Sequence, residues 1–446
     1  MHRYHELRVP GRFEPLALAG RLAGADVFDG HVVYERAGEW WFAGDRLVEV
    51  ILNRDAIETV TDSGTVAEPW TDTPLRQVRD ALAEAGVQGW HAFGWAGFEL
   101  AYALAGRPDL VGGEQPLLHM AIPRTEIRLG ADEVIVRSVD EHRLAEVRDL
   151  LRTPFDVSAR EATPVDVLDD SSRVAYQASV AKAVSDIGNG KLQKVILSRA
   201  VDVPFEVDLV STYVLGRRRN TPARSFLLDL GGWQAAGFSP ETVTEVSADG
   251  EVSTQPLAGT RAYVDGSESD VDRRLDLVSD PKEVFEHAAS VKLAYEELEA
   301  LCEPGSVTVK EFMAVKERGS VQHLGSRVNG TLSGGRNAFD ALAALFPAVT
   351  ASGIPKLPAY DRIAALEDRP RDLYAGAVIM VAQDGSLDAA LVLRAIYRKD
   401  GRTWLRAGAG IVADSTPERE YEETCEKLGS VAPHVVRAAR ALAYRG

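Results

Sequence analysis

The chain has 446 residues, a hydrophobic content of 45% and a formal net charge of -17. Such a composition supports a large buried core, while the acidic charge excludes nucleic acid and anionic membrane surfaces as partners. An anionic substrate would therefore need a local cluster of basic side chains. The two distant cysteines have no metal-binding spacing, the N-terminal residues show no apolar signal segment, and no apolar run is long enough to span a bilayer, so we expect a cytoplasmic protein.

Residues 1–150 combine short alternating segments, such as 31–44 and 132–139, with a few helical ones. Residues 152–172 are rich in Pro and Asp and have no clear period, which is typical of a connector. We therefore predict an N-terminal packing subdomain over residues 1–155, which belongs to the same fold, and a catalytic region over residues 170–440.

The second region mixes helices and strands without regular alternation. An amphipathic helix is predicted within 172–190, where glycines end it, and a strand follows at 194–203. Later strands are joined by Ala-Asp-Gly and Gln-Asp-Gly turns, which favour hairpins and antiparallel pairing. Further helices are predicted at 281–302, 336–346 and 416–441. This order favours the α+β class.

The segment DSTPEREYEETCEKL, residues 414–428, carries five glutamates on one predicted helix. Its start has the residues of a capping box, with Ser415 or Thr416 as N-cap and Glu418 three residues on. One stripe is apolar, and it contains Tyr421, Cys425 and Leu428. Glu420 and Glu423 share the neighbouring face, where like charges repel unless a cation intervenes. Lys427 is one candidate for that cation, which would make the pair an ordinary surface feature, and a metal ion is the other.

A second helix, predicted from Asp280 and Pro281 onward, has the same pattern. Asp280 has the position of an N-cap, and Glu283 has the position that closes a capping box. Glu283 and Glu286 then share one face. Two helices that each present a pair of glutamates would suit one hard cation such as Mg²⁺, provided that the helices meet.

Several segments of the chain, taken together, resemble the chorismate-utilising enzymes, a family that includes isochorismate, salicylate, anthranilate and aminodeoxychorismate synthases. In order, they are KVILSRA, AAGFSPE, QPLAGTRA, DPKEVFEHAASV, VQHLGS, FPAVTASGIPK, LYAGAV, and RAGAGIV followed by PEREYEETCEKL. The resemblance is tight over about 170–440 and loose before that, and it is strongest to the salicylate synthases of siderophore pathways. It implies a large single-domain α+β fold of the anthranilate synthase component I type, in which two antiparallel sheets pack as a sandwich with helices outside.

The resemblance also implies a Mg²⁺ ion held by glutamates of the two helices. The matching positions are Glu286, Glu420 and Glu423, with Glu283 nearby in an indirect contact. Three carboxylates that face a dianionic substrate would repel it unless a divalent ion lay between them.

The family's first reaction adds water at C2 of the chorismate ring and expels the C4 hydroxyl group. The resemblance assigns the base to Lys194 and the acid to Glu241. A lysine that acts as a base near neutral pH needs its pKa lowered by about three units from ~10.4, and an acidic glutamate needs its pKa raised. Without the resemblance, Lys194 would be read as a strand-end lysine that reaches solvent, and Glu241 as a turn residue after Pro240.

Other positions match groups that bind the substrate. Arg394 and Lys427 are expected to bind carboxylates, and His323 and Tyr374 to contact the ring or the pyruvyl portion. Backbone N–H groups are expected to be offered by Gly259, Thr260, Gly408 and Gly410.

Lys194 separates the branches of the family, because the relatives that use ammonia have a small residue there and depend on a glutaminase. No glutaminase nucleophile motif surrounds either cysteine, so we expect water as the nucleophile, no glutaminase subunit, and a monomer or weak dimer. Thr350, Ala351 and Tyr374 resemble the salicylate branch. The prediction is a Mg²⁺-dependent salicylate synthase that acts through isochorismate; the alternatives are an isochorismate synthase without lyase activity and a catalytically silent relative that binds chorismate-like anions or a partner.

Overall fold

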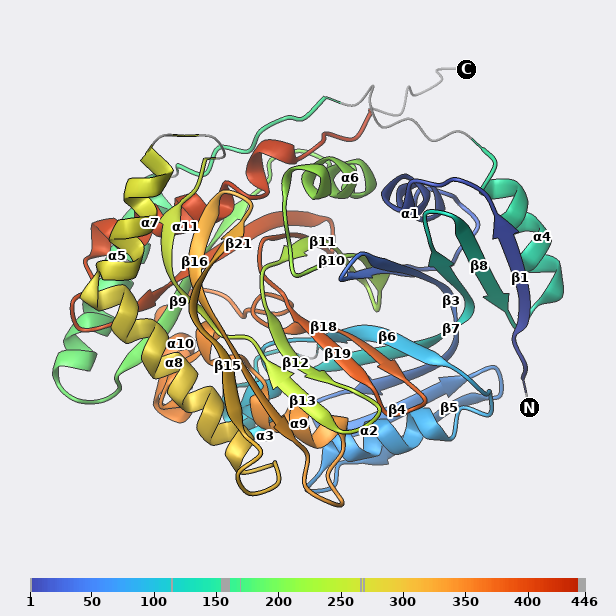
Figure 1. The fold of residues 1–446 in the computed structure, drawn as a ribbon, viewed down its shortest axis with the longest axis horizontal. Helices are drawn as coiled ribbons and strands as arrows, with labels where there is room; N and C mark the ends of the chain where they lie inside the picture. The colour runs from blue at the N-terminus through green and yellow to red at the C-terminus, as the bar shows by residue number, and fades with distance from the viewer. Residues whose placement is uncertain are drawn as a thin grey trace.

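The computed structural model describes residues 2–113, 115–153, 161–168, 170–264, 267 and 269–439. Strands fill the interior of the molecule and helices lie around its periphery (Figure 1). The described strands are β1 (His5–Pro10), β2 (His31–Arg36), β3 (Glu39–Leu52), β4 (Ala56–Thr61), β5 (Gly64–Pro69), β6 (His91–Ala96), β7 (Leu118–Leu129), β8 (Glu133–Ser138), β9 (Lys194–Asp202), β10 (Arg224–Leu230), β11 (Trp233–Ser239), β12 (Thr242–Val246), β13 (Glu251–Thr254), β14 (Leu257–Ala262), β15 (Thr308–Arg318), β16 (Val321–Thr331), β17 (Gly353–Ile354), β18 (Ala377–Ala382), β19 (Leu387–Leu391), β20 (Ala395–Lys399) and β21 (Arg402–Ile411).

The helices that surround these strands are mostly short. They are α1 (Pro15–Ala23), α2 (Pro74–Ala83), α3 (Leu100–Leu104), α4 (Glu141–Leu150), α5 (Asp170–Gly188), α6 (Leu209–Arg219), α7 (Ser269–Ser279), α8 (Pro281–Glu299), α9 (Ala338–Leu345), α10 (Lys356–Leu366) and α11 (Pro417–Leu428), with short 3-10 helices η1 (Pro108–Leu110), η2 (Val349–Ala351) and η3 (Ala432–His434). None of the described helices is both long and apolar enough to cross a membrane.

Two long strands, β3 and β7, belong to both sheets of the fold. Their antiparallel register shifts between Arg46 and Val48, which leaves Leu47 as an extra residue in β3. A bulge of this kind bends a strand and increases its twist. The first half of β3 pairs with β2, and the second half pairs with β4. The first halves and the second halves of these strands therefore belong to different sheets.

From this shared pair the strands continue in two directions. One direction runs through β2, β10, β11, β20, β21 and β9 to β17. The other runs through β6, β18, β19, β12 and β13 to β16, which also pairs with β14 and β15. All these pairings are antiparallel. The α+β single-domain fold with two antiparallel sheets and outer helices is confirmed, and the bent strands make the two sheets continuous.

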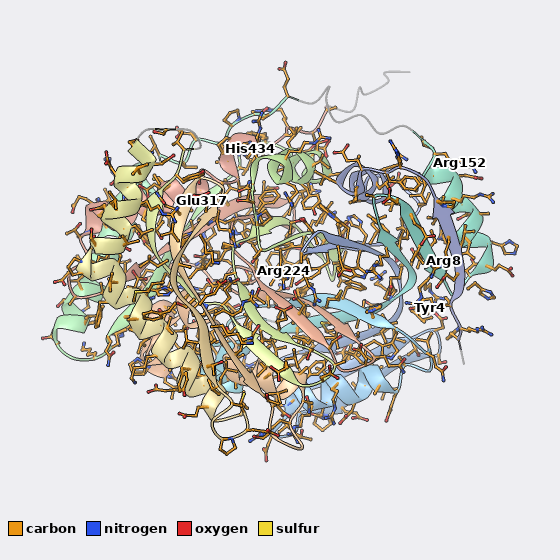
Figure 2. All side chains as sticks on the ribbon, in the orientation of Figure 1. Tyr4, Arg8, Arg152, Arg224, Glu317 and His434 are labelled. Atoms are coloured by element: carbon orange, nitrogen blue, oxygen red, sulfur yellow. The ribbon has the colours of Figure 1, made fainter. Side chains whose placement is uncertain are left out.

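Alternation along the strands gives each sheet two faces. In β10, Phe226 and Leu228 belong to one hydrophobic cluster, while Leu227 belongs to a second one on the opposite side. Between the sheets, Arg224 of β10 donates to both carboxylate oxygens of Asp388 on β19, at 2.8 and 2.6 Å. Arg224 lies near the middle of the molecule (Figure 2). Its buried ion pair links one sheet directly to the other.

N-terminal strands pair with strands from the second half of the chain, as β2 does with β10 and β6 with β18. The division into residues 1–155 and 170–440 stays a prediction. Part of the predicted connector at 152–172, namely 154–160 and 169, lies outside the described residues, as do residues 155 and 440, which bound the two predicted regions.

The predicted helix at 416–441 is wrong in its second half. Helix α11 ends at Leu428, and Gly429 forms its C-cap. Beyond it, Pro433 has no N–H to continue a helix. The chain instead forms isolated bridges, which pair Val436 with Ala162 and Arg437 with Val207. The helices predicted at 172–190, 281–302 and 336–346 agree with α5, α8 and α9 within a few residues.

Candidate active site

A pocket lies where the far ends of the two sheets meet helices α8 and α11. One sheet contributes β9 and β21, and the other contributes β14 and β16. Most of the predicted site residues line this pocket, namely Glu241, Gly259, Thr260, Glu286, His323, Thr350, Tyr374, Arg394, Gly408, Gly410, Glu423 and Lys427. Lys194 and Glu283 contact residues of its wall, namely Glu286 and Thr260. Glu420 pairs with Lys282, outside the residues that line the pocket. The structure thus brings the predicted residues together, although their individual roles stay predictions.

Lys194 is the first residue of β9, and its side chain is buried, with 2% exposed. Its Nζ donates to the Ser290 hydroxyl at 3.0 Å and lies 2.9 Å from Glu286 Oε1. The Ser290 hydroxyl in turn donates to the backbone oxygen of Glu286. A strand-end lysine that reaches solvent is therefore the wrong interpretation. The amine faces the interior, at the pocket wall.

Glu241 lies between β11 and β12, and it is 3% exposed. Burial raises the pKa of its carboxyl group to about 8, against the lowering effect of the Thr350 hydroxyl, which donates to Glu241 Oε1. The positive charges of Lys194 and Lys427 also act to lower the pKa without overcoming the effect of burial. The carboxyl group is therefore mainly protonated at neutral pH, which suits a proton donor.

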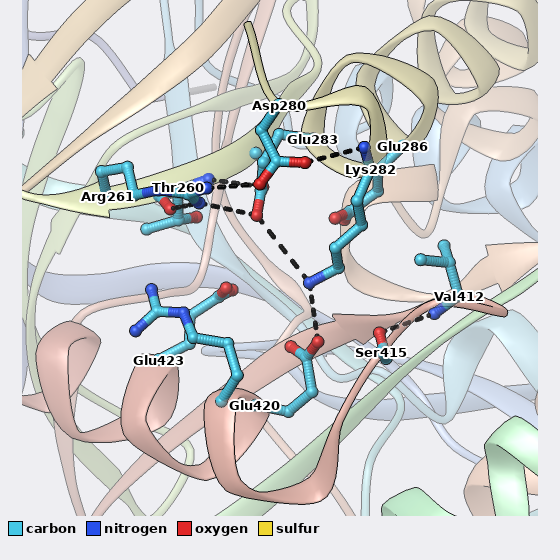
Figure 3. Close-up of polar contacts among 12 residues, drawn as sticks. Thr260, Arg261, Asp280, Lys282, Glu283, Glu286, Val412, Ser415, Glu420 and Glu423 are labelled. Atoms are coloured by element: carbon cyan, nitrogen blue, oxygen red, sulfur yellow. Dashed lines mark hydrogen bonds and ion pairs between the residues drawn. The ribbon is translucent and has the colours of Figure 1, made fainter. Parts of the chain in front are cut away.

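Four carboxylates from α8 and α11 face one another across the gap between the two helices (Figure 3). Each has a basic partner within 3 Å. The nitrogen–oxygen distances are 2.9 Å for Lys194–Glu286, 2.7 Å for Arg261–Glu283, 2.7 Å for Lys282–Glu420 and 2.7 Å for Lys427–Glu423. Four acidic groups are thus balanced by four basic ones, which explains how so much charge is tolerated in a buried place.

The two glutamates of α11 differ in their electrostatic environment. Burial and the negative charge of Glu423 raise the pKa of Glu420. The pKa of Glu423 is lowered because Lys427 and Lys282 outweigh the effect of its own burial. Glu420 is fully buried, and its Oε2 has no hydrogen-bond partner among the residues that the structure describes. A buried carboxylate oxygen without a partner is costly, so this atom is a candidate ligand for a cation.

The cluster of four glutamates described above supplies oxygen donors, which a hard divalent cation prefers. Oxygen donors from Glu286, Glu420 and Glu423 fit such an ion, and the unpartnered Oε2 of Glu420 gives it an available contact. In the described part of the chain, no three acidic, His or Cys side chains are already gathered at metal-binding geometry. Lys282 lies between two of the carboxylates instead, those of Glu283 and Glu420.

Glu283 is occupied at both oxygens. Its Oε2 accepts from the backbone N–H of Thr260 at 3.0 Å, and its Oε1 accepts from Arg261 at 2.7 Å. The capping box predicted for Glu283 is therefore wrong, although Asp280 does cap α8 by accepting from the backbone N–H of Lys282 at 2.8 Å. The N–H of Thr260, which was expected to face a ligand, already donates within the protein.

The capping box predicted for α11 is also wrong. The N-cap is Thr416, which makes no side-chain cap bond. The hydroxyl of Ser415 accepts from the backbone N–H of Val412 at 3.0 Å instead (Figure 3). Glu418 consequently has no capping partner in Ser415.

Arg394 carries an unbalanced charge on the pocket wall. It donates to the Ser430 hydroxyl at 3.1 Å and to Nε2 of His323 at 2.8 Å. Burial and the charges of Arg394 and Lys427 lower the pKa of His323 well below its usual value, so this ring is neutral and accepts at Nε2. Burial also lowers the pKa of Arg394 to about 10. Among the described residues no carboxylate lies within ion-pair distance of Arg394, which leaves its charge for an anionic ligand.

Gly408 and Gly410 allow close packing in β21. A Cβ atom at residue 410 would lie 2.1 Å from Glu286 Oε1, and one at residue 408 would lie 2.8 Å from Tyr374 Oη. Glycine is therefore needed there to admit neighbouring side chains. The expected donation of the two backbone N–H groups to a ligand stays a prediction.

Two basic residues of the site were missed in the sequence. Arg406 lines the pocket, and its guanidinium carbon lies 5.4 Å from the centre of the Tyr374 ring. It shares a strand face with Gly408 and Gly410, so period-two alternation in β21 would have identified it. Lys282 precedes Glu286 by four residues, which places both on one face of α8.

Comparison with known proteins agrees with this geometry. The model of the chorismate binding enzyme family matches residues 31–433. A salicylate synthase of Mycolicibacterium paratuberculosis is 44% identical over 431 residues, which cover 96% of this chain and 95% of that protein. An anthranilate synthase component 1 of Methanothermobacter thermautotrophicus is 33% identical, covering 87% and 84%. The crystal structure of anthranilate synthase component I from Streptococcus pneumoniae matches with a TM-score of 0.74 and 26% identity, covering 90% and 92%. The chain therefore belongs to the chorismate binding enzymes.

Proposed function

We propose that this protein is a Mg²⁺-dependent salicylate synthase, which converts chorismate through isochorismate to salicylate and pyruvate. The proposal rests on two buried groups near one pocket. The amine of Lys194 contacts the wall residue Glu286, and the carboxyl group of Glu241 lines the pocket with a raised pKa that favours its protonated form at neutral pH. The 44% identity to a salicylate synthase across nearly the whole chain supports this choice within the family.

In the first step, Lys194 removes a proton from water as the oxygen bonds to C2 of the ring. The two ring double bonds each move by one position, and the C4–O bond breaks. Glu241 gives its proton to the departing hydroxyl group, which leaves as water. Each of these proton transfers is typically worth ~10²–10⁴ in rate. Proton and charge then balance, because one group gains the proton that the other loses.

In the second step, the hydrogen at C2 moves to the methylene carbon of the enolpyruvyl group as the C3–O bond breaks. This gives pyruvate and the aromatic ring of salicylate. The transfer is internal to isochorismate, so the protein's contribution is a compact substrate conformation. Thr350 and Tyr374 on the pocket wall are the residues that we assign to this shape.

The substrate's two carboxylates need two sets of positive groups. Arg394, with its unbalanced charge, is assigned to one carboxylate, and Lys427 is a second donor on the same wall. A Mg²⁺ ion held by Glu286, Glu420 and Glu423, with Glu283 in an indirect contact, would neutralise the other carboxylate where it approaches these glutamates.

The proposal is tested by incubating the protein with chorismate and Mg²⁺ and separating the products by chromatography. Salicylate with an equimolar amount of pyruvate is the expected result. Isochorismate alone would instead identify an isochorismate synthase, and unchanged chorismate would contradict both activities. A sample treated with EDTA tests the metal requirement, and heat-denatured protein controls for spontaneous decay of chorismate.

The protonation of Glu241 predicts a pH dependence. Because only the protonated carboxyl group can act as the acid, kcat/KM is expected to fall as pH rises through about 8, with little loss from this group below that value. The measurement is the initial rate of salicylate formation from pH 6 to 10. In Thr350→Val the hydroxyl that lowers the pKa of Glu241 is absent, so the descending limb should move to higher pH. A rate that stays flat through pH 9, or a limb that moves lower in Thr350→Val, would contradict the assignment.

A further inference from the structure

Lys282 lies among the four glutamates of α8 and α11 (Figure 3). It is the second residue of α8, and its side chain is 14% exposed. Its Nζ donates to Glu420 Oε1 at 2.7 Å and lies 3.8 Å from Glu283 Oε1. The ammonium group therefore connects the two helices that supply the acidic residues. The reaction proposed above does not use it.

The other three basic partners have separate tasks. Lys194 is assigned as the base and Lys427 as a substrate ligand, while Arg261 also pairs with Asp276 and Asp280. In the described structure, the ion pairs of Lys282 are made with Glu420 and Glu283 alone. It is thus the one cation of the group whose contacts all lie among the candidate metal ligands.

Lys282 satisfies the hydrogen bonding of only one carboxylate oxygen of Glu420, its main partner. Glu420 is fully buried, its Oε1 accepts from Lys282, and its Oε2 has no partner. An ammonium group brings one positive charge and a few donated hydrogen bonds. A magnesium ion brings two charges and binds several oxygens at once, so it can use the atom that the lysine leaves unpaired.

We propose that Lys282 is a tethered counter-cation, which holds the carboxylates together in the metal-free protein and withdraws when Mg²⁺ binds. This rests on the metal site of the proposed function. Without a cation at this place, the buried Glu420 would be left unpaired beside Glu423, which is costly. The flexible four-carbon stem of a lysine allows its ammonium group to move away without a change in α8. Because Mg²⁺ must displace the ammonium group, the lysine lowers the apparent affinity for the metal.

The test uses Lys282→Met, which keeps a long apolar side chain and removes the charge. If the ammonium group occupies the site for nine-tenths of the time or more, its removal should tighten Mg²⁺ binding by about tenfold or more. The metal-free variant should also unfold at a temperature several degrees lower than the wild type, because its carboxylates then repel one another. Calorimetric titration with Mg²⁺ measures the first effect, and thermal unfolding in EDTA measures the second.

Two further variants serve as controls. Lys292→Met removes an exposed lysine of the same helix, which pairs with Glu296 at the surface, and it should change neither quantity. Lys282→Arg keeps the positive charge, so it should preserve the metal-free stability and bind Mg²⁺ no more tightly than the wild type. It also provides the test if Lys282→Met does not fold.

The outcomes separate this inference from the proposed function. Unchanged or weaker Mg²⁺ binding by Lys282→Met, with normal binding by the wild type, overturns the role of Lys282 and leaves the metal site in place. Tighter Mg²⁺ binding by Lys282→Arg also overturns the role. Binding by Lys282→Met alone also overturns the role, because the lysine would then block the site in the wild type instead of withdrawing from it. If neither protein binds Mg²⁺, the metal assignment fails and this inference fails with it.

Discussion

Replacing Lys194 by alanine is expected to slow the formation of salicylate from chorismate by ~10²–10⁴-fold, the usual contribution of a general base. The amine is buried, 2.9 Å from Glu286 and hydrogen-bonded to Ser290, so alanine at this position removes the proposed base from the interior. Initial rates at saturating chorismate and Mg²⁺ measure the effect. The variant should keep its fold, which circular dichroism checks, because the removed side chain leaves the backbone pairing of β9 unchanged.

A matched control and a second substrate sharpen this experiment. Lys191→Ala removes a half-exposed lysine that pairs with Asp186, three residues before Lys194, and should react at the wild-type rate. When isochorismate is supplied, Lys194→Ala should still release pyruvate at a rate close to that of the wild type, because the second step needs no base. Wild-type turnover of chorismate by Lys194→Ala would show that another group activates the water.

Replacing Glu423 by glutamine is expected to weaken Mg²⁺ binding by at least about tenfold, since even outer-shell partners of a metal contribute 10–100-fold. The amide keeps the shape of the side chain but removes one negative charge. That charge makes the electrostatic potential at the cluster of four glutamates more negative and so favours a cation there. Calorimetric titration with Mg²⁺ measures the affinity directly. Activity should recover in part at high Mg²⁺ concentration, which distinguishes a lost ligand from a lost fold.

Glu422→Gln is the control for this variant. Glu422 is the adjacent residue of α11, its side chain is 66% exposed, and it pairs with Arg419 at the surface. Its replacement should leave the Mg²⁺ affinity unchanged. Equal affinities for Glu423→Gln and the wild type would exclude Glu423 as a ligand and would leave its pairing with Lys427 as its main role.

The acidic helix shows how far the sequence could be read. Spacing alone placed Glu420 and Glu423 on one face and Lys427 beside them. These three residues belong to one helix, so their proximity follows from its period. The partners of Glu420 and Glu286 come from α8 and β9, which are distant in sequence. Local periodicity carries no information about such contacts, because they depend on how two elements approach each other in space.

The pocket wall illustrates a second limit. Residues such as Glu241, Arg394 and His323 come from turns and strands of both sheets, so no local pattern connects them. The resemblance to a family did so, because it compares the order of motifs along the whole chain. It did not indicate Lys282 or Arg406, although both share a face with residues that it had marked. The backbone N–H of Thr260 was likewise misjudged, because its partner is a side chain from α8.

The bulge at Leu47 has a consequence for the distant pocket. From β3 to β9 there are six steps between neighbouring strands, and at ~4.8 Å a step they span about 29 Å. A rotation of roughly 2° at the shared strands would shift β9 by about 1 Å at that distance, a displacement that can cost a reaction ~10²-fold. The curvature of two strands far from the pocket therefore influences the spacing between β9 of one sheet and the strands β14 and β16 that the other sheet contributes to the pocket. The width of the pocket thus depends on the bulge at Leu47, at the other end of the sheet.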